Sequence, residues 1–254
     1  MAVNLKKSRL SGANPGDFQS MIQHFGVVTV MNVDVYDTAT LLAEVATTSL
    51  INSNKAHTFD NIKAQSSDVG NARGILDVCA AATTRAAGYI GRIESLKIAN
   101  ITSESSDKTI TGGQSNSPLI KFYNGKTARL EMQDALGHAD MLEAFNGAVT
   151  EFNANGGTDV AGVHFGGDVP GSKTLVGDSF FIDQVTGAQV PVKILFYNLV
   201  PEPIFNFTQD AEGDATVFDM NGDLMLTNIL VADASGSARS HGVFYSIVDP
   251  TPGE

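Results

Sequence analysis

The sequence predicts a mainly β protein, an antiparallel β-sandwich or barrel with one flanking α-helix. Three observations support this fold class. Strand-like segments follow one another along the chain, a single segment has a clear helical pattern, and 25 glycines with 17% charged residues indicate many turns. We expect an N-terminal arm at 1–17, one β domain at 18–248 with long loops at 52–74 and 103–118, and a tail at 249–254.

Two segments form the start of the predicted β domain. Residues 27–36 (VVTVMNVDVY) alternate apolar and polar positions and predict a strand. Residues 37–51 are ambiguous, because Asp37 or Thr38 can cap a helix whereas the β-branched residues near Val45 favour a strand. We predict a strand for this segment.

The middle of the chain combines strand patterns with a polar segment. Residues 75–84 fit a strand or a buried helix, and residues 89–102 predict strand structure. Residues 103–118 (SESSDKTITGGQSNSP) predict an exposed, linker-like loop. The Asn124-Gly125 pair then predicts a tight hairpin that joins a strand on each side of it.

One helix and a further strand pair complete the predicted domain. The helix is expected at about 138–145, where Leu142 and Phe145 share a face, and Gly147 is expected to end it. Residues 178–199 predict two strands, with Pro191 at the start or the edge of the second.

A short acidic segment, Asp219–Asp223 (DMNGD), resembles part of a calcium loop. An EF-hand needs oxygen ligands at spaced positions and a bidentate Glu at position twelve, whereas position twelve counted from Asp219 is Leu230. We therefore interpret the segment as a hairpin turn and predict no metal site.

Residues 167–174 (GDVPGSKT) differ at one position from a phosphate-binding loop. That loop has the pattern G-x-x-x-x-G-K-[ST] and opens a helix whose first amides hold phosphate, and here Ser172 stands at the second glycine position. The residues after Lys173 predict a Phe-rich strand, and Pro170 has no amide hydrogen to offer. We predict a solvated turn and no nucleotide site.

No other motif indicates an enzyme. The five histidines are far apart in sequence and form no metal-binding pair, and there is no G-x-S-x-G nucleophile motif. The single cysteine, Cys79, lies in an apolar context and is interpreted as a buried small side chain. We predict neither a catalytic residue nor a cofactor.

Charge is distributed unevenly along the chain, whose formal net charge is −12. Residues 1–130 contain 13 Lys/Arg and 10 Asp/Glu, whereas residues 131–254 contain 3 and 18. Such an acidic surface repels DNA, because DNA binding depends on neutralised phosphates. The N-terminus lacks the apolar core of a signal peptide, and no apolar stretch approaches a membrane span, so we expect a soluble protein made in the cytoplasm.

Three stretches resemble the major tail tube protein of long-tailed bacteriophages. They are NGKTARLEMQDALGHADMLEAFNGA, GDSFFIDQVTGAQVPVKILFYN and FTQDAEGDATVFDMNGDLM, which lie within about residues 120–225. The resemblance implies a β-sandwich or barrel with a flanking helix. It also implies hexameric rings stacked into the tube of a virion tail, through which DNA passes, and it implies no catalytic residue.

This resemblance sets the expected partners. We expect further copies of the chain, sheath, tape-measure, baseplate or terminator proteins, DNA passing without specific binding, and no membrane. Four basic residues are predicted inter-subunit contacts: Lys6, Lys7, Arg9 and Lys173. The alternatives are another virion component, namely a tail terminator, a decoration protein or the tube of a contractile injection system, and a glycan-binding β-sandwich. The glycan-binding alternative is the weaker one, because the chain has five Tyr and no Trp.

Overall fold

The computed structural model describes the greater part of the predicted domain. The described residues are 29–47, 75–76, 79, 88–94, 96–112, 117–134, 138–153, 159–182, 189–203, 218–232 and 238–248. The expectations of a loop at 52–74, a turn at Thr186-Gly187 and a tail at 249–254 lie outside them. Across the described part of the chain, no helix is long and apolar enough to cross a membrane.

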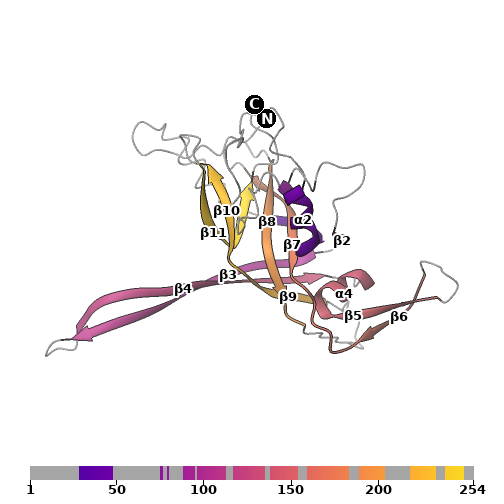
Figure 1. The fold of residues 1–254 in the computed structure, drawn as a ribbon, viewed down its shortest axis with the longest axis horizontal. Coiled ribbons are helices and arrows are strands. Elements are labelled where there is room, and N and C mark those ends of the chain that lie inside the picture. Colours follow the sequence, from indigo (N-terminus) through magenta and orange to yellow (C-terminus); the bar gives the residue numbers. More distant parts are fainter. Residues whose placement is uncertain are drawn as a thin grey trace.

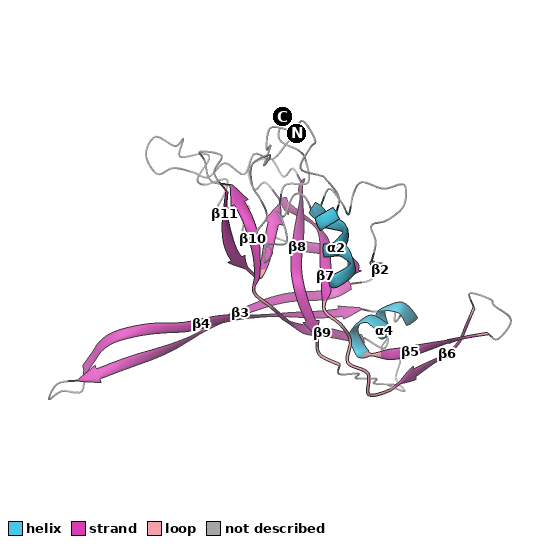
Figure 2. Cartoon of the chain, in the orientation of Figure 1, coloured by secondary structure: helices cyan, strands magenta, loops and turns pink. Residues whose placement is uncertain are grey.

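Strands dominate these residues, and two helices accompany them (Figures 1 and 2). The elements are β1 (Thr29–Asp37), α2 (Thr38–Thr47), β2 (Tyr89–Ile93), β3 (Leu96–Gly112), β4 (Ser117–Asp134), α4 (Ala139–Asn146), β5 (Ala148–Phe152), β6 (Val160–Phe165), β7 (Lys173–Ile182), β8 (Gln189–Pro201), β9 (Phe218–Leu224), β10 (Thr227–Ala232), β11 (Ala238–Val243) and β12 (Tyr245–Val248). Helical backbone also occurs at Ile75, Leu76 and Cys79, which favours the buried-helix interpretation of residues 75–84.

One antiparallel sheet organises the fold, as the sequence predicts. Its strand order is β2-β1-β7-β8-β9-β4-β3, and β12 pairs with β8 beside this path. The long strand β8 has two partners along its second edge, since Lys193–Phe196 pair with β12 and Leu199–Pro201 pair with β9. Pro191 pairs with Phe180 of β7 and precedes both of these contacts, which confirms its predicted place at the start of the strand. β5–β6 and β10–β11 form two separate two-stranded sheets.

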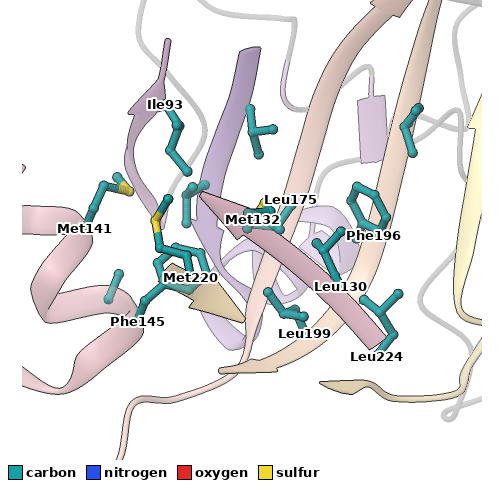
Figure 3. Packing of buried hydrophobic residues seen from close by; sticks show 14 of the residues in the cluster. Ile93, Leu130, Met132, Met141, Phe145, Leu175, Phe196, Leu199, Met220 and Leu224 are labelled. Atoms are coloured by element: carbon teal, nitrogen blue, oxygen red, sulfur yellow. The ribbon is translucent and has the colours of Figure 1, made fainter. Parts of the chain in front are cut away.

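The main core lies where the two halves of this sheet meet. Val33 and Val35 of β1 belong to the same buried cluster as Leu130 and Met132 of β4. Figure 3 shows Met141 and Phe145 of α4 directed into this cluster beside β9. Packing of sheet on sheet, with the apolar positions of each strand facing inward, is the arrangement of a β-sandwich. The predicted helix at 138–145 is therefore confirmed, and Gly147 ends it with a left-handed φ of 65°.

The opposite face of β1, β7 and β8 carries a second core. Leu41 of α2 and Ile75 pack there against Tyr36, Val176 and Tyr197. Cys79 is partly buried at the edge of the same cluster, as expected for a small apolar side chain. Both faces of these central strands are consequently covered.

The predicted strand at 37–51 is wrong, because residues 38–47 form the helix α2. Asp37 caps this helix, since its Oδ1 accepts hydrogen bonds from the amide and the hydroxyl of Thr40 at 3.0 and 2.7 Å. Burial of Leu41 against β1 and β7 stabilises the helix beyond what the weak helix formers near Val45 provide.

The predicted loop at 103–118 and the hairpin at Asn124-Gly125 are both wrong where the structure describes them. Residues 103–112 continue β3, and β4 runs without interruption from Ser117 to Asp134. Ser106 pairs with Gly125 and Asp107 pairs with Tyr123, so Asn124 is an extra residue in the ladder. The Asn-Gly pair marks a β-bulge instead of a turn.

The predicted turn at Asp219–Asp223 is also wrong, because these residues lie inside β9. Gly222 makes this possible by allowing close contact with β8. A Cβ atom at this position would lie 2.5 Å from the carbonyl oxygen of Val200. The glycine thus serves close strand packing and not a reversal of the chain.

Candidate assembly surfaces

The outer parts of β3 and β4 form a long two-stranded projection, which we call the arm (residues 104–112 and 117–127). It extends away from the body of the fold in Figure 1. All residues from 100 to 111 are exposed, including Ile110 at 47%. Because neighbouring residues of a strand point to opposite faces, both faces of the β3 part of the arm are open.

Polar and charged side chains stabilise the arm only weakly by themselves. Lys121 and Asp107 form an ion pair at 3.1 Å, and both side chains are largely in water. Exposed ion pairs contribute about 0–1 kcal/mol, and an isolated two-stranded ribbon is marginally stable at best. The described side-chain contacts therefore add little to the stability that strand pairing gives the arm.

The inner part of β4, with its neighbours β3 and β9, has two contrasting faces. Leu130, Met132, Met220 and Leu224 are buried on the core side. The register of β9, β4 and β3 places polar residues on the other side, and we call this the acidic face: Asp219, Asn221, Asp223, Arg129, Glu131, Gln133, Asn100 and Thr102. Alternation along the three strands produces both faces.

Arg129 is the single cation of the acidic face. Its guanidinium hydrogen-bonds with Glu202 of the segment after β8, and it lies 3.4 Å from Glu131 and 3.8 Å from Asp223. These carboxylates, Glu202 foremost, raise the pKa of Arg129 above its ordinary value. Asp219 accepts a hydrogen bond from the Gln133 amide at 3.0 Å. Three carboxylates, those of Glu131, Glu202 and Asp223, lie within 4 Å of this one guanidinium, so the face carries a net negative charge.

Lys173 begins β7 and has a carboxylate partner within its own chain. Its side chain is 8% exposed, and its Nζ lies 3.9 Å from Oδ2 of Asp37. Burial lowers the pKa of Lys173, while the charges of Asp37 and Glu143 act in the opposite direction. Whether this lysine also meets a neighbouring copy stays a prediction.

The loop resembling a phosphate-binding motif leads into the strand β7 and not into a helix, as predicted. Its Ser172 carbonyl accepts a hydrogen bond from the Thr38 amide at 3.2 Å. The Thr40 amide of the same helix end is bound to Asp37 at 3.0 Å. These amides at the start of α2 are thus already hydrogen-bonded within the chain.

A second charged cluster crosses four strands and contains both signs of charge. Arg92 of β2 lies 3.5 Å from Asp34 of β1 and 2.6 Å from Asp178 of β7. Lys193 of β8 forms an ion pair with the same Asp178. Arg92 is directly opposite Asp34, and Lys193 is directly opposite Asp178. Opposite charges paired across neighbouring strands stabilise a sheet, so we assign this cluster to the fold and not to a site.

Of the predicted contacts, only Lys173 lies in the described part of the chain, and Lys6, Lys7 and Arg9 lie outside it. The sequence predicts neither that residues 104–112 belong to a long two-stranded arm nor which residues form the acidic face. The Thr-Ile-Thr run at 109–111 consists of β-branched residues, which favour a strand, and this pattern could have indicated the arm. For the acidic face, the signal was the alternation of charged and apolar residues through Arg129–Gln133.

The described residues contain no group of three or more His, Cys, Asp and Glu side chains arranged to hold a metal ion. His164 and Glu151 form an exposed pair at 2.9 Å on the β5–β6 hairpin. No protein-family model matches the chain, and no curated protein has a recognisably similar sequence.

Proposed function

We propose that this chain is a structural subunit of a phage tail tube, which self-assembles into stacked hexameric rings and forms a conduit for DNA. The observation that carries this proposal is the arm. Two strands of 17 and 18 residues extend far beyond the body they start from, and the described residues of the chain leave the arm uncovered. A second copy of the chain is the simplest molecule to cover it.

The acidic face supports the conduit part of the proposal. It is built on three hydrogen-bonded strands, so its carboxylates are held on a rigid surface. Facing the inside of a tube, these charges would repel DNA phosphates and allow DNA to slide without adhering. The net charge of −12 agrees with that role.

Self-assembly is tested by comparing the complete chain with an arm-shortened variant. In this variant residues 104–127 are replaced by Asn-Gly, so that the paired residues Ser103 and Ala128 flank a two-residue turn. Analytical ultracentrifugation and negative-stain electron microscopy are expected to show rings or tubes for the complete chain and a folded monomer for the variant. A complete chain that remains monomeric at high concentration would overturn the proposal.

A further inference from the structure

The β5–β6 hairpin exposes an unusual number of large apolar side chains. Val149, Phe152, Val160 and Phe165 of the hairpin, and Val169 in the segment that follows it, are all about half exposed or more, and they lie within 21 consecutive residues. Scattered exposed apolar residues are ordinary, whereas a group of them on one projecting element indicates a binding surface.

The hairpin register shows how these side chains are arranged. Phe152 pairs with Val160 and Ala148 pairs with Phe165, whereas Val149 pairs with His164 on the opposite face. Thr150 lies between Ala148 and Phe152 on their face, and its hydroxyl hydrogen-bonds with Glu143 of α4 at 3.3 Å. The helix therefore contacts the hairpin near its base, while Phe152 and Val160 at the outer end remain 54% and 48% exposed.

The chain segment that forms this surface is acidic. Residues 138–172 contain Asp140, Glu143, Glu151, Asp159 and Asp168, and no Lys or Arg. A partner should therefore offer basic side chains together with apolar area. Lysine suits both requirements, because its alkyl stem packs on aromatic rings while its ammonium group contacts carboxylates.

The arm of the same protein has this chemistry. It contains three lysines, the exposed Lys108, Lys121 and Lys126, against the two acids Glu104 and Asp107, and it exposes Ile110. Arm and β5–β6 hairpin project from opposite ends of the molecule in Figure 1. The arm of one copy is thus unable to reach the hairpin of the same copy. In two copies placed head to tail, the arm of one can contact the hairpin of the other.

We propose that the arm of one copy packs on the apolar, acidic surface of the β5–β6 hairpin of the next copy. The inference rests on the proposed function only in requiring that the chain associates with itself. It names the surface that receives the arm, and it makes the contact heterologous, so that every copy offers one donor and one acceptor surface.

Cross-linking between singly labelled copies tests this contact. In a Cys79→Ala background, one protein carries Thr109→Cys in the arm, and a second carries Asn153→Cys beside Phe152. A short bismaleimide is expected to yield the mixed dimer at least tenfold above either homodimer. A protein with Asn228→Cys, an exposed residue of β10, is the matched control and is expected to yield only background.

Charge reversal supplies a second test. Lys108→Glu with Lys126→Glu, or Glu151→Lys with Asp159→Lys, is expected to weaken association about tenfold, and mixing the two variants is expected to restore it. Rings or tubes that form without the mixed cross-link overturn this contact and leave the proposed function standing. Cross-linking of Asn153→Cys to itself also overturns it, because it would show an isologous contact, and a chain that never associates overturns both.

Discussion

The Nζ of Lys173 lies 3.9 Å from Oδ2 of Asp37, the residue that ends β1 and caps α2. Asp37 thereby uses one carboxylate oxygen for the helix and the other for the start of β7. The contact joins α2, for which the sequence predicts a strand, to β7, which the sequence predicts correctly as a strand. Mutation can separate the two contributions of Asp37 to stability, one as the cap of α2 and one as the partner of Lys173.

Asp37→Ala is expected to lower the free energy of unfolding by about 1–2 kcal/mol, because the cap of α2 is lost and Lys173 is left without its near carboxylate. Asp37→Asn retains a capping side chain and is expected to lose less. Hydrogen bonds from Thr40 lower the pKa of Asp37. Its contribution is therefore fully present above the unfolded value of 3.8 and is lost as the pH falls through the lower folded value. Equal losses for Ala and Asn in urea denaturation would contradict a capping role.

Lys173→Met is expected to maintain or increase stability at neutral pH, because burial disfavours the charged amine. The pKa of Lys173 is lowered, so between its folded value and the unfolded value of about 10.4 the unfolded chain binds more protons. Wild-type stability relative to Lys173→Met should then rise with pH over that range. Denaturation curves at several pH values measure the difference, and a constant difference would refute the expectation.

Tyr197 is expected to ionise late in an alkaline titration. Burial raises its pKa to about 12, although its hydroxyl donates a hydrogen bond to Ser246 Oγ at 2.7 Å. The folded state binds its proton more tightly, so the stability that this proton provides declines as the pH rises from about 10 towards 12. Ultraviolet titration should show one late phenolate that disappears in Tyr197→Phe. Its persistence in that variant would assign it to another tyrosine.

Gly222→Ala is expected to destabilise the fold by about 1–3 kcal/mol, because the added methyl group would meet the Val200 carbonyl oxygen at 2.5 Å. Gly125→Ala is the matched control, since a Cβ atom there has no neighbour within 4 Å. The control is expected to change stability by less than about 0.5 kcal/mol. Thermal denaturation of both variants measures the contrast, and equal midpoints would show that β8 and β9 can separate at little cost.

Added positive charge on the acidic face is expected to cause adhesion to DNA. Asn100→Lys with Asn221→Lys places two cations there, and Asn228→Lys with His241→Lys places two on β10 and β11. The first variant should retain duplex DNA at low ionic strength and release it as salt increases. A filter-binding assay on assembled protein compares them. Equal retention of DNA by both variants would mean that adhesion depends on the net charge of the protein and not on the acidic face.

The sequence predicts the fold class well, and it predicts poorly how far individual strands extend. Alternation in β1 and the cap and glycine around α4 are local patterns, so residues 29–37 and 139–146 are recognisable from them alone. The α2 helix depends on burial of Leu41 by strands distant in sequence, which local propensity does not report.

The candidate surfaces were hidden for a related reason. A Ser/Thr-rich run and an Asn-Gly pair are typical of loops, whereas here Ser103–Gly112 and Asn124-Gly125 belong to one extended ladder. Cross-strand pairing over a long distance overrides the local preference of both segments. Lys173 was predicted to contact a neighbouring copy, and the structure places Asp37 of the same chain 3.9 Å from its Nζ.

The continuity of β4 has a mechanical consequence. The strand that forms half of the arm passes directly into the core, where seven successive residues, Ala128–Asp134, pair with β9 on one side while β3 flanks the other. A pull along the arm would load these hydrogen bonds in parallel and not one after another. The arm is thus anchored in the body of the fold along these seven residues. A force applied to the arm would therefore be transmitted into the body.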